Sequence, residues 1–310
     1  MDISVIIVSW NAQEFLRQCL TTLLEFKMRR GLEVIVVDNA SADGSAEMVE
    51  AEFSCIRVIR NQQNLGFARS NNIGIAASRG RYICLINSDV KLVVNCLDEL
   101  ADYLERHSEV GLVGPKILNS DGTIQYSCRE FPSLWNNFCQ ASGLHRAFSS
   151  IHFFSGEQMT YFTHDRSREV DALSGCFWMV RREAFESVGL LDEDFFIYSE
   201  DVDWCRRCRD AGWQVVFLPT TSAIHYGGGS SENAPTRFAV EQQRATLQYW
   251  RKHHGTLECA GIRAILFFRH FVRYLLAVSS LWAGRNGLSE KRRRLQLTSA
   301  CMKALVAGSS

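Results

Sequence analysis

The first 90 residues alternate between short apolar runs rich in β-branched side chains and longer stretches in which apolar positions recur with helical spacing. Short apolar runs predict strands, and longer periodic stretches predict helices. The pattern predicts strands at 3–8, 32–37, 55–59 and 82–86 and helices at 13–26 and 68–78. The strand segments are apolar at most positions, as expected when helices cover both faces of a parallel sheet. We therefore predict an α/β fold with a doubly wound, mostly parallel sheet.

The pattern is interrupted once and then continues. The segment from about 114 to 169 has weak periodicity and many polar and aromatic residues, so we interpret it as loops that face a substrate. The regular elements around it are helices at 97–106, 182–188, from 200 and at 238–253, and strands at 110–113, 172–180 and 213–218. Without a repeat or a low-complexity linker, we expect one domain over residues 1–255 and a separate tail over 256–310.

Charge is distributed unevenly along the chain. The sequence has 34 basic and 34 acidic residues, which gives no reason to expect a nucleic acid partner. From Ile262 onward, however, nine Lys or Arg residues accompany one acidic residue, Glu290, so this tail has a net charge of nine minus one, or +8. We expect a catalytic body with a basic helical tail that anchors or docks it.

The first part of the tail is amphipathic. On a helical wheel Arg263, Arg269, His270 and Arg273 fall within one third of the circumference, whereas the residues outside it include Phe267, Phe268, Phe271, Tyr274, Leu275 and Val278. Such a segment suits a helix lying in a membrane interface, and the basic run at 291–294 adds attraction to anionic lipid. We expect peripheral association with the inner face of the cell membrane. Packing on the catalytic domain and a dimer contact are the alternatives.

The cysteine pattern favours a reducing compartment. Eleven cysteines are scattered without regular spacing, and their odd number argues against a disulfide framework. Cys205 and Cys208 form an isolated C-x-x-C within a helical pattern, which is weak evidence for a zinc or redox site. The start of the chain also lacks the pattern of a secretory signal peptide. We therefore expect a cytoplasmic protein.

Polar residues follow three of the predicted strands at the point where each strand ends. These segments are 9–11 (Ser-Trp-Asn), 38–44 (Asp-Asn-Ala-Ser-Ala-Asp-Gly) and 87–89 (Asn-Ser-Asp). Each alone is typical of strand ends and helix caps, but ligands of open parallel sheets bind at this edge. Three such segments together favour a ligand site. The sequence has neither a G-x-G-x-x-G nor a P-loop motif, so a dinucleotide site or a P-loop is not supported.

Five segments follow one another in an order typical of a known enzyme family. They are 5–11, 36–45 (VVDNASADGS), 64–72 (NLGFARSNN), 85–89 (LINSD) and 199–207 (SEDVDWCRR). Together they resemble the inverting family 2 glycosyltransferases of GT-A fold, especially the bacterial rhamnosyltransferase-like branch that builds surface polysaccharides. The resemblance implies a GT-A fold and transfer of a sugar from a nucleoside diphosphate sugar. It does not extend into the tail beyond about residue 255.

The resemblance implies a nucleotide site at the ends of the first two strands. Asp38 matches the carboxylate that accepts the imino N–H of a uracil or thymine base, with Asn39 beside it and the backbone of Val8 and Ser9 completing the pocket. Arg69 matches a position that faces the diphosphate. The alternatives are an Asx turn for Asp38 and a solvated helical side chain for Arg69.

The resemblance also implies a metal site. Asn87-Ser88-Asp89 lies where the family has D-x-D, so Asp89 matches the carboxylate that holds Mg²⁺ or Mn²⁺ against the diphosphate. The first Asp of that motif is Asn87 here, which weakens metal affinity but leaves a hard oxygen ligand. His225 matches a second metal ligand, and an imidazole favours Mn²⁺ over Mg²⁺. A structural role is the alternative for His225.

Asp201 matches the general base that takes the proton from the acceptor hydroxyl, and Glu200 is the alternative base. Both residues open a predicted helix, so they also complement its dipole. Asp203 is expected to orient neighbours such as Arg207. Ser174 and Gly175 resemble a small-residue turn beside the donor sugar.

The donor and the acceptor are open at the level of the sequence. Rhamnose from a thymidine diphosphate (TDP) donor is expected from the branch resemblance, and galactose or N-acetylglucosamine from a uridine diphosphate (UDP) donor remain alternatives. The expected acceptor is a saccharide or a lipid-linked saccharide of cell-surface polysaccharide synthesis. A nucleotidyltransferase and a catalytically inactive nucleotide-sugar-binding module are the competing functions. The first usually needs a glycine-rich basic loop after the first strand, and the second would not retain the acidic residues.

Overall fold

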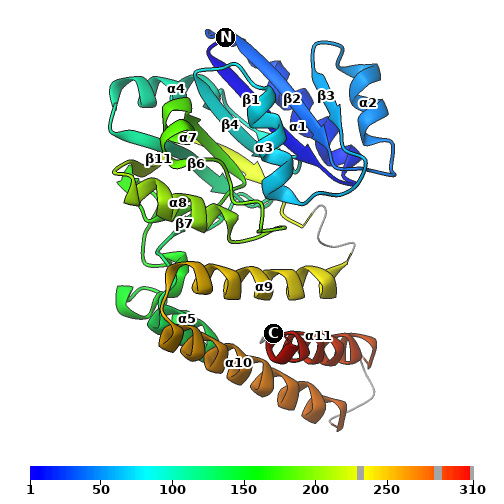
Figure 1. The fold of residues 1–310 in the computed structure, drawn as a ribbon, viewed down its shortest axis with the longest axis vertical. Helices are drawn as coiled ribbons and strands as arrows, with labels where there is room; N and C mark the ends of the chain where they lie inside the picture. Colours follow the sequence, from blue (N-terminus) through cyan, green and yellow to red (C-terminus); the bar gives the residue numbers. More distant parts are fainter. Residues whose placement is uncertain (229–233, 283–287, 308–310) are drawn as a thin grey trace. The chain divides into compact units, whose positions relative to one another are not determined.

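A computed structural model describes residues 1–228, 234–282 and 288–307, and it forms two compact units (Figure 1). The sheet unit comprises Met1–Phe131, Phe162–Phe196 and Glu200–Ser230. The helical unit comprises Pro132–Tyr161, Ile197–Ser199 and Ser231–Ser310. The two units interleave along the chain, so neither of them is a single continuous range. The predicted domain boundary at residue 255 stays a prediction.

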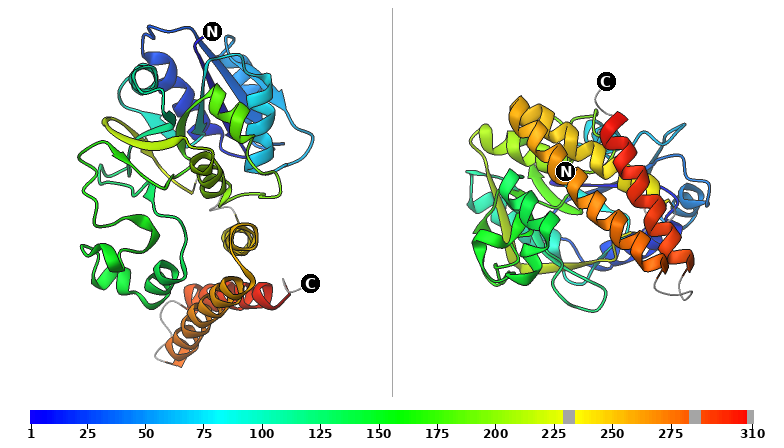
Figure 2. Two further views of the ribbon diagram at one scale, coloured as in Figure 1. Left: turned by 60° about the vertical axis from the view of Figure 1, so that its left-hand side comes forward. Right: turned by 90° about the horizontal axis from the view of Figure 1, so that it is seen from below.

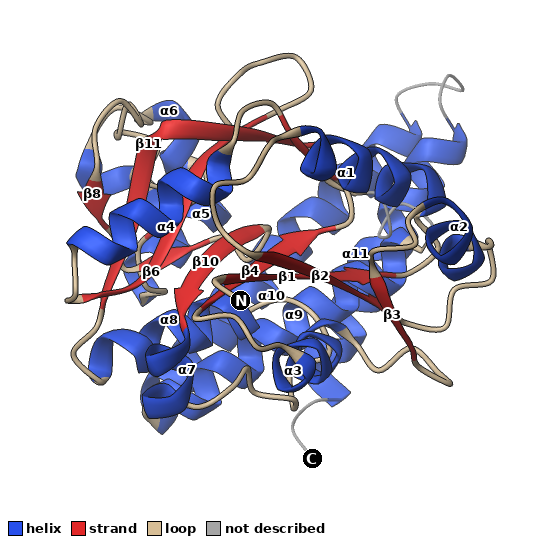
Figure 3. Cartoon of the chain, turned by 90° about the horizontal axis from the view of Figure 1, so that it is seen from above, coloured by secondary structure: helices blue, strands red, loops and turns tan. Residues whose placement is uncertain are grey.

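The sheet unit is built on one central sheet with the strand order β3-β2-β1-β4-β10-β6-β11-β5, in which β8 pairs with β11 (Figure 3). Strands β3, β2, β1, β4, β6 and β11 run in one direction, and β10, β5 and β8 run in the other. The strands are β1 Ile3–Ser9, β2 Leu32–Asp38, β3 Arg57–Arg60, β4 Tyr82–Asn87, β5 Val90–Leu92, β6 Val110–Leu118, β8 Arg168–Glu169, β10 Phe177–Arg181 and β11 Gln214–His225.

Helices cover both faces of this sheet (Figure 3). The first face carries α1 Gln13–Glu25, α2 Ser45–Glu52 and α4 Cys96–Arg106, and the second carries α3 Phe67–Ala77, α7 Arg182–Val188 and α8 Glu200–Asp210. Alternate residues of β1 serve the two faces: Val5 and Ile7 join the core under α1 and α4, whereas Ile6 packs under Gly74 of α3. A Cβ on Gly74 would lie 2.4 Å from the Ile6 side chain, so glycine permits this close packing. The predicted α/β fold is confirmed.

Several predicted strands differ in detail from the structure. The third strand is an edge strand with exposed ends rather than a buried one, because only β2 pairs with it. The predicted strand at 172–180 is two strands, β9 Ala172–Leu173 and β10, separated by a turn at residues 174–176. Strand β9 leaves the main sheet and pairs with β7 Cys128–Arg129. Strand β11 extends well beyond the predicted end at residue 218, with a register shift there.

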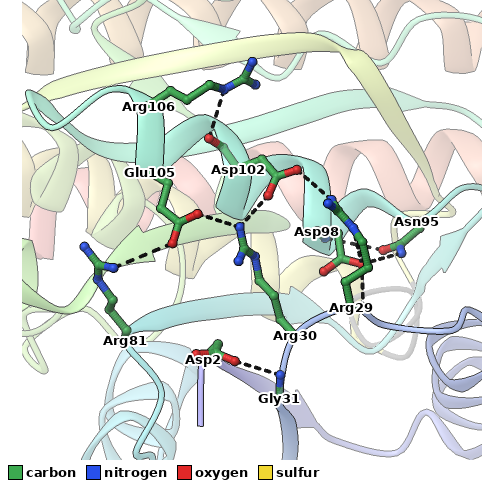
Figure 4. A network of polar contacts seen from close by, with 10 residues as sticks. All are labelled: Asp2, Arg29, Arg30, Gly31, Arg81, Asn95, Asp98, Asp102, Glu105 and Arg106. Atoms are coloured by element: carbon green, nitrogen blue, oxygen red, sulfur yellow. Dashed lines mark hydrogen bonds and ion pairs between the residues drawn. The ribbon is translucent and has the colours of Figure 1, made fainter.

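The amino-terminal edge of the sheet is held by a network of paired charges (Figure 4). Arg29 and Arg30 precede β2 and contact Asp102 of α4, and Arg30 also contacts Glu105 at 2.7 Å. Arg81, which precedes β4, lies 3.7 Å from Glu105. These largely exposed pairs tie α4 to the strand starts and leave the opposite edge of the sheet for ligands.

The helical unit contains three long helices and a shorter helical segment (Figure 2). The segment at 114–169, which we expected to be loops, contains helical elements because Ser133 and Asn136 form a reciprocal capping box that starts α5. The elements of the unit are α5 Leu134–Ser142, α6 Leu144–Ala147, η1 His152–Phe154, η2 Gly156–Gln158, α9 Pro235–His253, α10 Thr256–Trp282 and α11 Leu288–Ala307.

The polarity of α10 is unusual for a helix in water. His270 is buried within the unit, whereas Phe267, Phe268, Leu275 and Leu276 are exposed. None of the helices in the described part of the chain is long and apolar enough to cross a membrane. Helix α10 therefore presents an apolar outer face without being a membrane span.

Candidate active site

The carboxyl ends of three strands bring together the polar residues that follow them. From β1 the chain continues to β2 on one side, and β4 lies on the other side of β1. The crevice at such a reversal of strand order is where open α/β sheets bind ligands. Ser9, Asp38 and Asn87 end these three strands.

Asp38 has one oxygen engaged and one available. Its Oδ2 accepts the backbone N–H of Ser41 at 3.1 Å, so the turn interpretation is correct for that oxygen. Its Oδ1 is buried and has no hydrogen-bond partner among the described residues. The same holds for the Oγ of Ser9 on the neighbouring strand. Because buried polar atoms are nearly always hydrogen-bonded, these two oxygens indicate a place for a ligand. Val8, which is partly exposed beside Ser9, completes this corner.

Asn39 holds the loop that precedes α3. Its Oδ1 accepts hydrogen bonds from Leu65 N–H and Ser70 Oγ, both at 2.9 Å. Its Nδ2 donates to Asn64 Oδ1 at 2.8 Å and to Gly66 O at 3.2 Å. Both amide hydrogens of the Asn39 side chain are therefore used within the protein. The side chain shapes the nucleotide corner through this loop.

Arg69 lies on α3 at the surface. Its side chain is 55% exposed, and its Nε lies 3.5 Å from Glu193 Oε2. Its contact with a diphosphate stays a prediction. Asn72, one turn further along α3, exchanges hydrogen bonds with the backbone of Leu191 at 2.8 and 3.1 Å. Asn72 therefore ties α3 to the segment that follows α7.

Asp89 and His225 lie side by side at the end of β4. Residue Val90 of β5 pairs opposite His225 at the end of β11, and the N–H of Tyr226 donates to Asp89 O at 3.0 Å. This pairing places His225 Nε2 3.2 Å from Asp89 Oδ1. Asn87 Nδ2 lies 3.4 Å from the same Nε2. The structure thus brings together two residues that are 136 positions apart in the sequence, 225 minus 89.

Gln125 fixes the tautomer of His225. Its Oε1 lies 2.6 Å from His225 Nδ1, and its Nε2 donates to His225 O at 3.1 Å. An amide oxygen only accepts, so Nδ1 carries a hydrogen, and Nε2 is the ring nitrogen that faces Asp89. A hydrogen-bonded Nδ1–H is the usual support of a metal-binding histidine. Gln125 lies in the weakly periodic segment, where the sequence gave no signal for it.

The residues at this corner fit a divalent cation. His225 Nε2 and Asp89 Oδ1 lie 3.2 Å apart, and an imidazole nitrogen and a carboxylate oxygen are both groups that bind divalent cations such as Mn²⁺. The described residues contain no group of three His, Cys, Asp or Glu side chains that could enclose an ion. Two protein ligands leave positions for phosphate oxygens and water, which is how Mg²⁺ is commonly bound beside a diphosphate.

Glu200 and Asp201, the first residues of α8, have different environments. Glu200 is only 5% exposed, and its Oε2 has no partner among the described residues. Burial raises the pKa of Glu200 well above its ordinary value, and the charges of Asp201 and Asp203 raise it further. Asp201 is partly exposed and accepts the backbone N–H of Gly175 at 3.0 Å. The two carboxyl groups are therefore distinct chemically.

Gly175 permits this contact with Asp201. A Cβ at residue 175 would lie 3.2 Å from Asp201 Cβ, a tight approach that leaves little room for a side chain. Ser174 donates its N–H to Ser127 O at 2.8 Å, which fixes the turn. Both residues thus position Asp201, and their contact with a donor sugar stays a prediction.

Cys176 links the segment that holds Asp201 to the end of β4. Its backbone oxygen accepts the N–H of Asn87 at 2.9 Å, and the preceding residue, Gly175, donates its N–H to Asp201 at 3.0 Å. Burial raises the pKa of the Cys176 thiol to about 12, and the charges of Asp89 and Asp201 both contribute to the rise.

Asp203 has a structural role. It is fully buried and contacts Arg207 Nε at 2.9 Å. Arg207 also donates to the backbone oxygens of Val188 and Leu190, which follow α7. The expectation that Asp203 orients Arg207 is confirmed.

Residues 4–189 match the family described as "Glycosyl transferase family 2". The chain belongs to glycosyl transferase family 2, and it is a glycosyltransferase. The predicted resemblance is therefore confirmed.

Two curated relatives are named as rhamnosyltransferases. The chain is 28% identical over 305 residues to N-acetylglucosaminyl-diphospho-decaprenol L-rhamnosyltransferase of Mycobacterium tuberculosis, which covers 94% of this chain and 95% of that protein. It is 26% identical over 281 residues to dTDP-rhamnosyl transferase RfbF of Shigella flexneri, covering 86% of this chain and 85% of that protein.

A solved structure supports the fold. The mannosyltransferase PcManGT of Pyrobaculum calidifontis, solved in complex with GDP-Man and Mn²⁺, aligns with a TM-score of 0.60 at 15% identity. The alignment covers 98% of this chain and 86% of that one. The GT-A fold is therefore common to both proteins.

Proposed function

We propose that the protein transfers rhamnose, with inversion, from TDP-rhamnose to a hydroxyl of a saccharide linked to a lipid diphosphate, in the synthesis of a cell-surface polysaccharide. The names of the two rhamnosyltransferase relatives support this donor and this kind of acceptor. The observation that carries the proposal is the turn at residues 174–176, which holds Asp201 through the Gly175 N–H and the end of β4 through Cys176 O, where Asp89 and His225 lie 3.2 Å apart.

The nucleotide is recognised at the corner of β1 and β2. Thymine and uracil each present one ring N–H, and the available Oδ1 of Asp38 accepts it. The Ser9 hydroxyl and the backbone at Val8 complete the contact. This set of groups does not distinguish the thymine methyl group, so UDP sugars serve as the comparison in the test below.

Asp89 and His225 hold a divalent cation against the diphosphate. When bound, the cation neutralises the charge that develops on the departing nucleoside diphosphate. The imidazole ligand favours Mn²⁺ over Mg²⁺, and the Gln125 contact keeps His225 Nε2 ready to bind it.

Asp201 is the general base. As the acceptor oxygen attacks the anomeric carbon, Asp201 takes the hydroxyl proton, the new glycosidic bond forms, and the bond from that carbon to the diphosphate oxygen breaks. The Gly175 N–H holds the carboxylate in place. Glu200 is a poorer candidate because its burial and raised pKa keep it in the protonated form, which cannot accept a proton.

The competing functions have less support. Membership of a glycosyltransferase family argues against a nucleotidyltransferase. An inactive binding module has no need of a glycine-held carboxylate next to a metal corner. The presence of Asp38, Asp89 and Asp201 in one crevice favours the enzyme.

The helical unit associates with the inner face of the cell membrane. The exposed apolar residues of α10 form its membrane face, which we define as Phe267, Phe268, Phe271, Val272, Leu275 and Leu276. A contiguous exposed apolar face rimmed by positive charge is typical of an interfacial helix. The net charge of +8 from Ile262 onward complements anionic lipid.

A screen of nucleotide sugars tests the donor. The protein is incubated with Mn²⁺ and each of TDP-rhamnose, UDP-galactose and UDP-N-acetylglucosamine, and release of the nucleoside diphosphate is measured with and without an N-acetylglucosaminyl diphospholipid. We expect release that depends on the acceptor from TDP-rhamnose above the other two. Preference for a UDP sugar would contradict the rhamnose assignment and leave the glycosyltransferase chemistry intact.

A further inference from the structure

Arg129, a cationic side chain, lies on the strand beside the turn that holds the proposed base, Asp201. Arg129 belongs to β7, whose pairing with β9 places it opposite Ala172. Strand β9 leads directly into Ser174 and Gly175, the turn that holds Asp201. Arg129 is thus attached by a strand pair to the segment that positions the base.

The Arg129 guanidinium is partly buried without a full set of partners. Its Nε is inaccessible to solvent and has no hydrogen-bond partner among the described residues. Its charge acts on Glu200 and on the thiol of Cys176, whose pKa values it lowers. Burial opposes the ionisation of Glu200, which makes it a weak counter-ion for the arginine. A buried donor on a permanent cation calls for an anion at this place.

We propose that Arg129 binds a diphosphate group of a reactant. Its planar guanidinium matches phosphate oxygens with two parallel hydrogen bonds, which an ammonium group cannot do. Under the proposed function the reaction involves two diphosphates, that of the nucleotide and that of the lipid-linked acceptor. The inference therefore rests on the proposed function and adds a recognition residue to it.

Arg129→Met removes the charge and keeps a side chain of similar length, and Arg129→Lys keeps the charge without the paired donors. Arg57→Met is the matched control, because Arg57 is an exposed arginine on the edge strand β3 of the same unit. Thermal denaturation of all variants checks that they are folded.

The nucleotide is tested by calorimetric titration of TDP, and of UDP, in the presence of Mn²⁺. If Arg129 contacts the donor diphosphate, Arg129→Met weakens binding by about 10- to 100-fold, since a charge-assisted pair of hydrogen bonds is lost. Arg129→Lys recovers part of this loss, and Arg57→Met binds as the unmodified protein does.

The acceptor is tested by kinetics at saturating donor. An N-acetylglucosaminyl diphospholipid is compared with octyl N-acetylglucosaminide, which offers the same sugar without phosphate. If Arg129 contacts the acceptor diphosphate, Arg129→Met lowers kcat/KM for the diphospholipid by about 10- to 100-fold, does not change kcat/KM for the octyl glycoside, and leaves TDP binding unchanged.

Two results would overturn the inference. One is unchanged nucleotide binding together with unchanged kcat/KM for the diphospholipid. The other is an equal loss of kcat/KM for both acceptors with unchanged nucleotide binding, which would show that Arg129 acts through Glu200 and Asp201. An unmodified protein that binds neither TDP nor UDP would instead contradict the proposed function.

Discussion

The sheet unit and the helical unit differ in which groups lie in unusual surroundings. In the sheet unit apolar side chains fill the interior, and the carboxyl ends of the strands carry the unpartnered oxygens of Ser9, Asp38 and Asn87. In the helical unit both ring nitrogens of His270 are buried without partners among the described residues, while Phe268 is 55% exposed. The oxygens at the strand ends favour a ligand site, whereas the exposed apolar face of α10 favours the membrane contact proposed above.

The two edges of the sheet also differ in how their charged groups are paired. At the amino-terminal edge Arg30, Asp102 and Glu105 neutralise one another (Figure 4). At the carboxyl-terminal edge His225 Nε2 lies 3.2 Å from Asp89 Oδ1, and Glu200 has an oxygen without a partner among the described residues. Charges that satisfy one another stabilise the fold, and charges left unsatisfied indicate binding.

The largest effect is expected from Asp201. Removal of a positioned general base typically costs about 10² to 10⁴ in rate, so Asp201→Asn should lose that much in kcat while its affinity for TDP and Mn²⁺ stays unchanged. Asp210→Asn, at the exposed end of the same helix, is the control. Near-normal turnover of Asp201→Asn together with an inactive Glu200→Gln would transfer the role of base to Glu200.

The metal corner should account for the next effect. Asp89→Ala should abolish the Mn²⁺-dependent part of TDP binding, because one of the two protein ligands is lost, and a chelator should do the same to the unmodified protein. Asp121→Ala, a carboxylate exposed on a turn, is the control. Full transfer activity in excess chelator would contradict the metal assignment.

Gln125 offers a sharper test, because it does not contact the ion. Loss of such a support typically costs about 10- to 100-fold in metal affinity or activity. Gln125→Leu should therefore raise the Mn²⁺ concentration needed for half-maximal rate by that factor. Gln125→Glu keeps an acceptor for the Nδ1–H of His225 and should retain much of the affinity. Equal behaviour of the two variants would show that the contact does not govern the metal.

The sequence predicted the parts of this site that depend on local pattern. The strand ends at Asp38 and Asp89 could be located because apolar runs precede them, and the pair Asp203 and Arg207 follows from its spacing of four on a helix. Gln125 was not predicted because its partner His225 lies 100 residues away, and no local pattern encodes that contact.

Arg129 and the contact of Gly175 with Asp201 were missed for a related reason. Both depend on the pairing of β7 with β9, two strands of two residues each that are too short to show periodicity. The continuous apolar run at 172–180 concealed the break between β9 and β10. The exposed apolar face of α10 was predicted only in part. The wheel separated the two faces of the helix, but only packing against the other helices determines which face is exposed.

The helical unit predicts a loss of membrane binding when its apolar face is made polar. Replacing Phe268, Leu275 and Leu276 by Gln in the full-length protein should weaken partition into vesicles with anionic lipid by about tenfold or more, since each exposed apolar side chain contributes roughly 1 kcal/mol on transfer. Replacing Val93 and Val94 of the sheet unit by Gln is the control. Flotation assays measure the bound fraction. If both variants bind the vesicles equally, the membrane face of α10 would be assigned to a protein contact instead.

The smallest expected effect concerns the free energy of unfolding and comes from the buried carboxyl group of Glu200. The pKa of Glu200 is raised in the folded state, so above its ordinary value of 4.5 the unfolded state releases a proton that the folded state retains. Glu200 therefore costs stability as pH rises above 4.5 toward its folded pKa, and it costs none below 4.5.

Glu200→Gln removes this cost, so its midpoint of thermal unfolding should exceed that of the unmodified protein at pH 7 and approach it at pH 4. A difference for Glu200→Gln that is constant from pH 4 to pH 7 would mean that Glu200 is ionised in the folded protein. The distinction between Glu200 as a buried acid and Asp201 as the general base would then lose its physical basis.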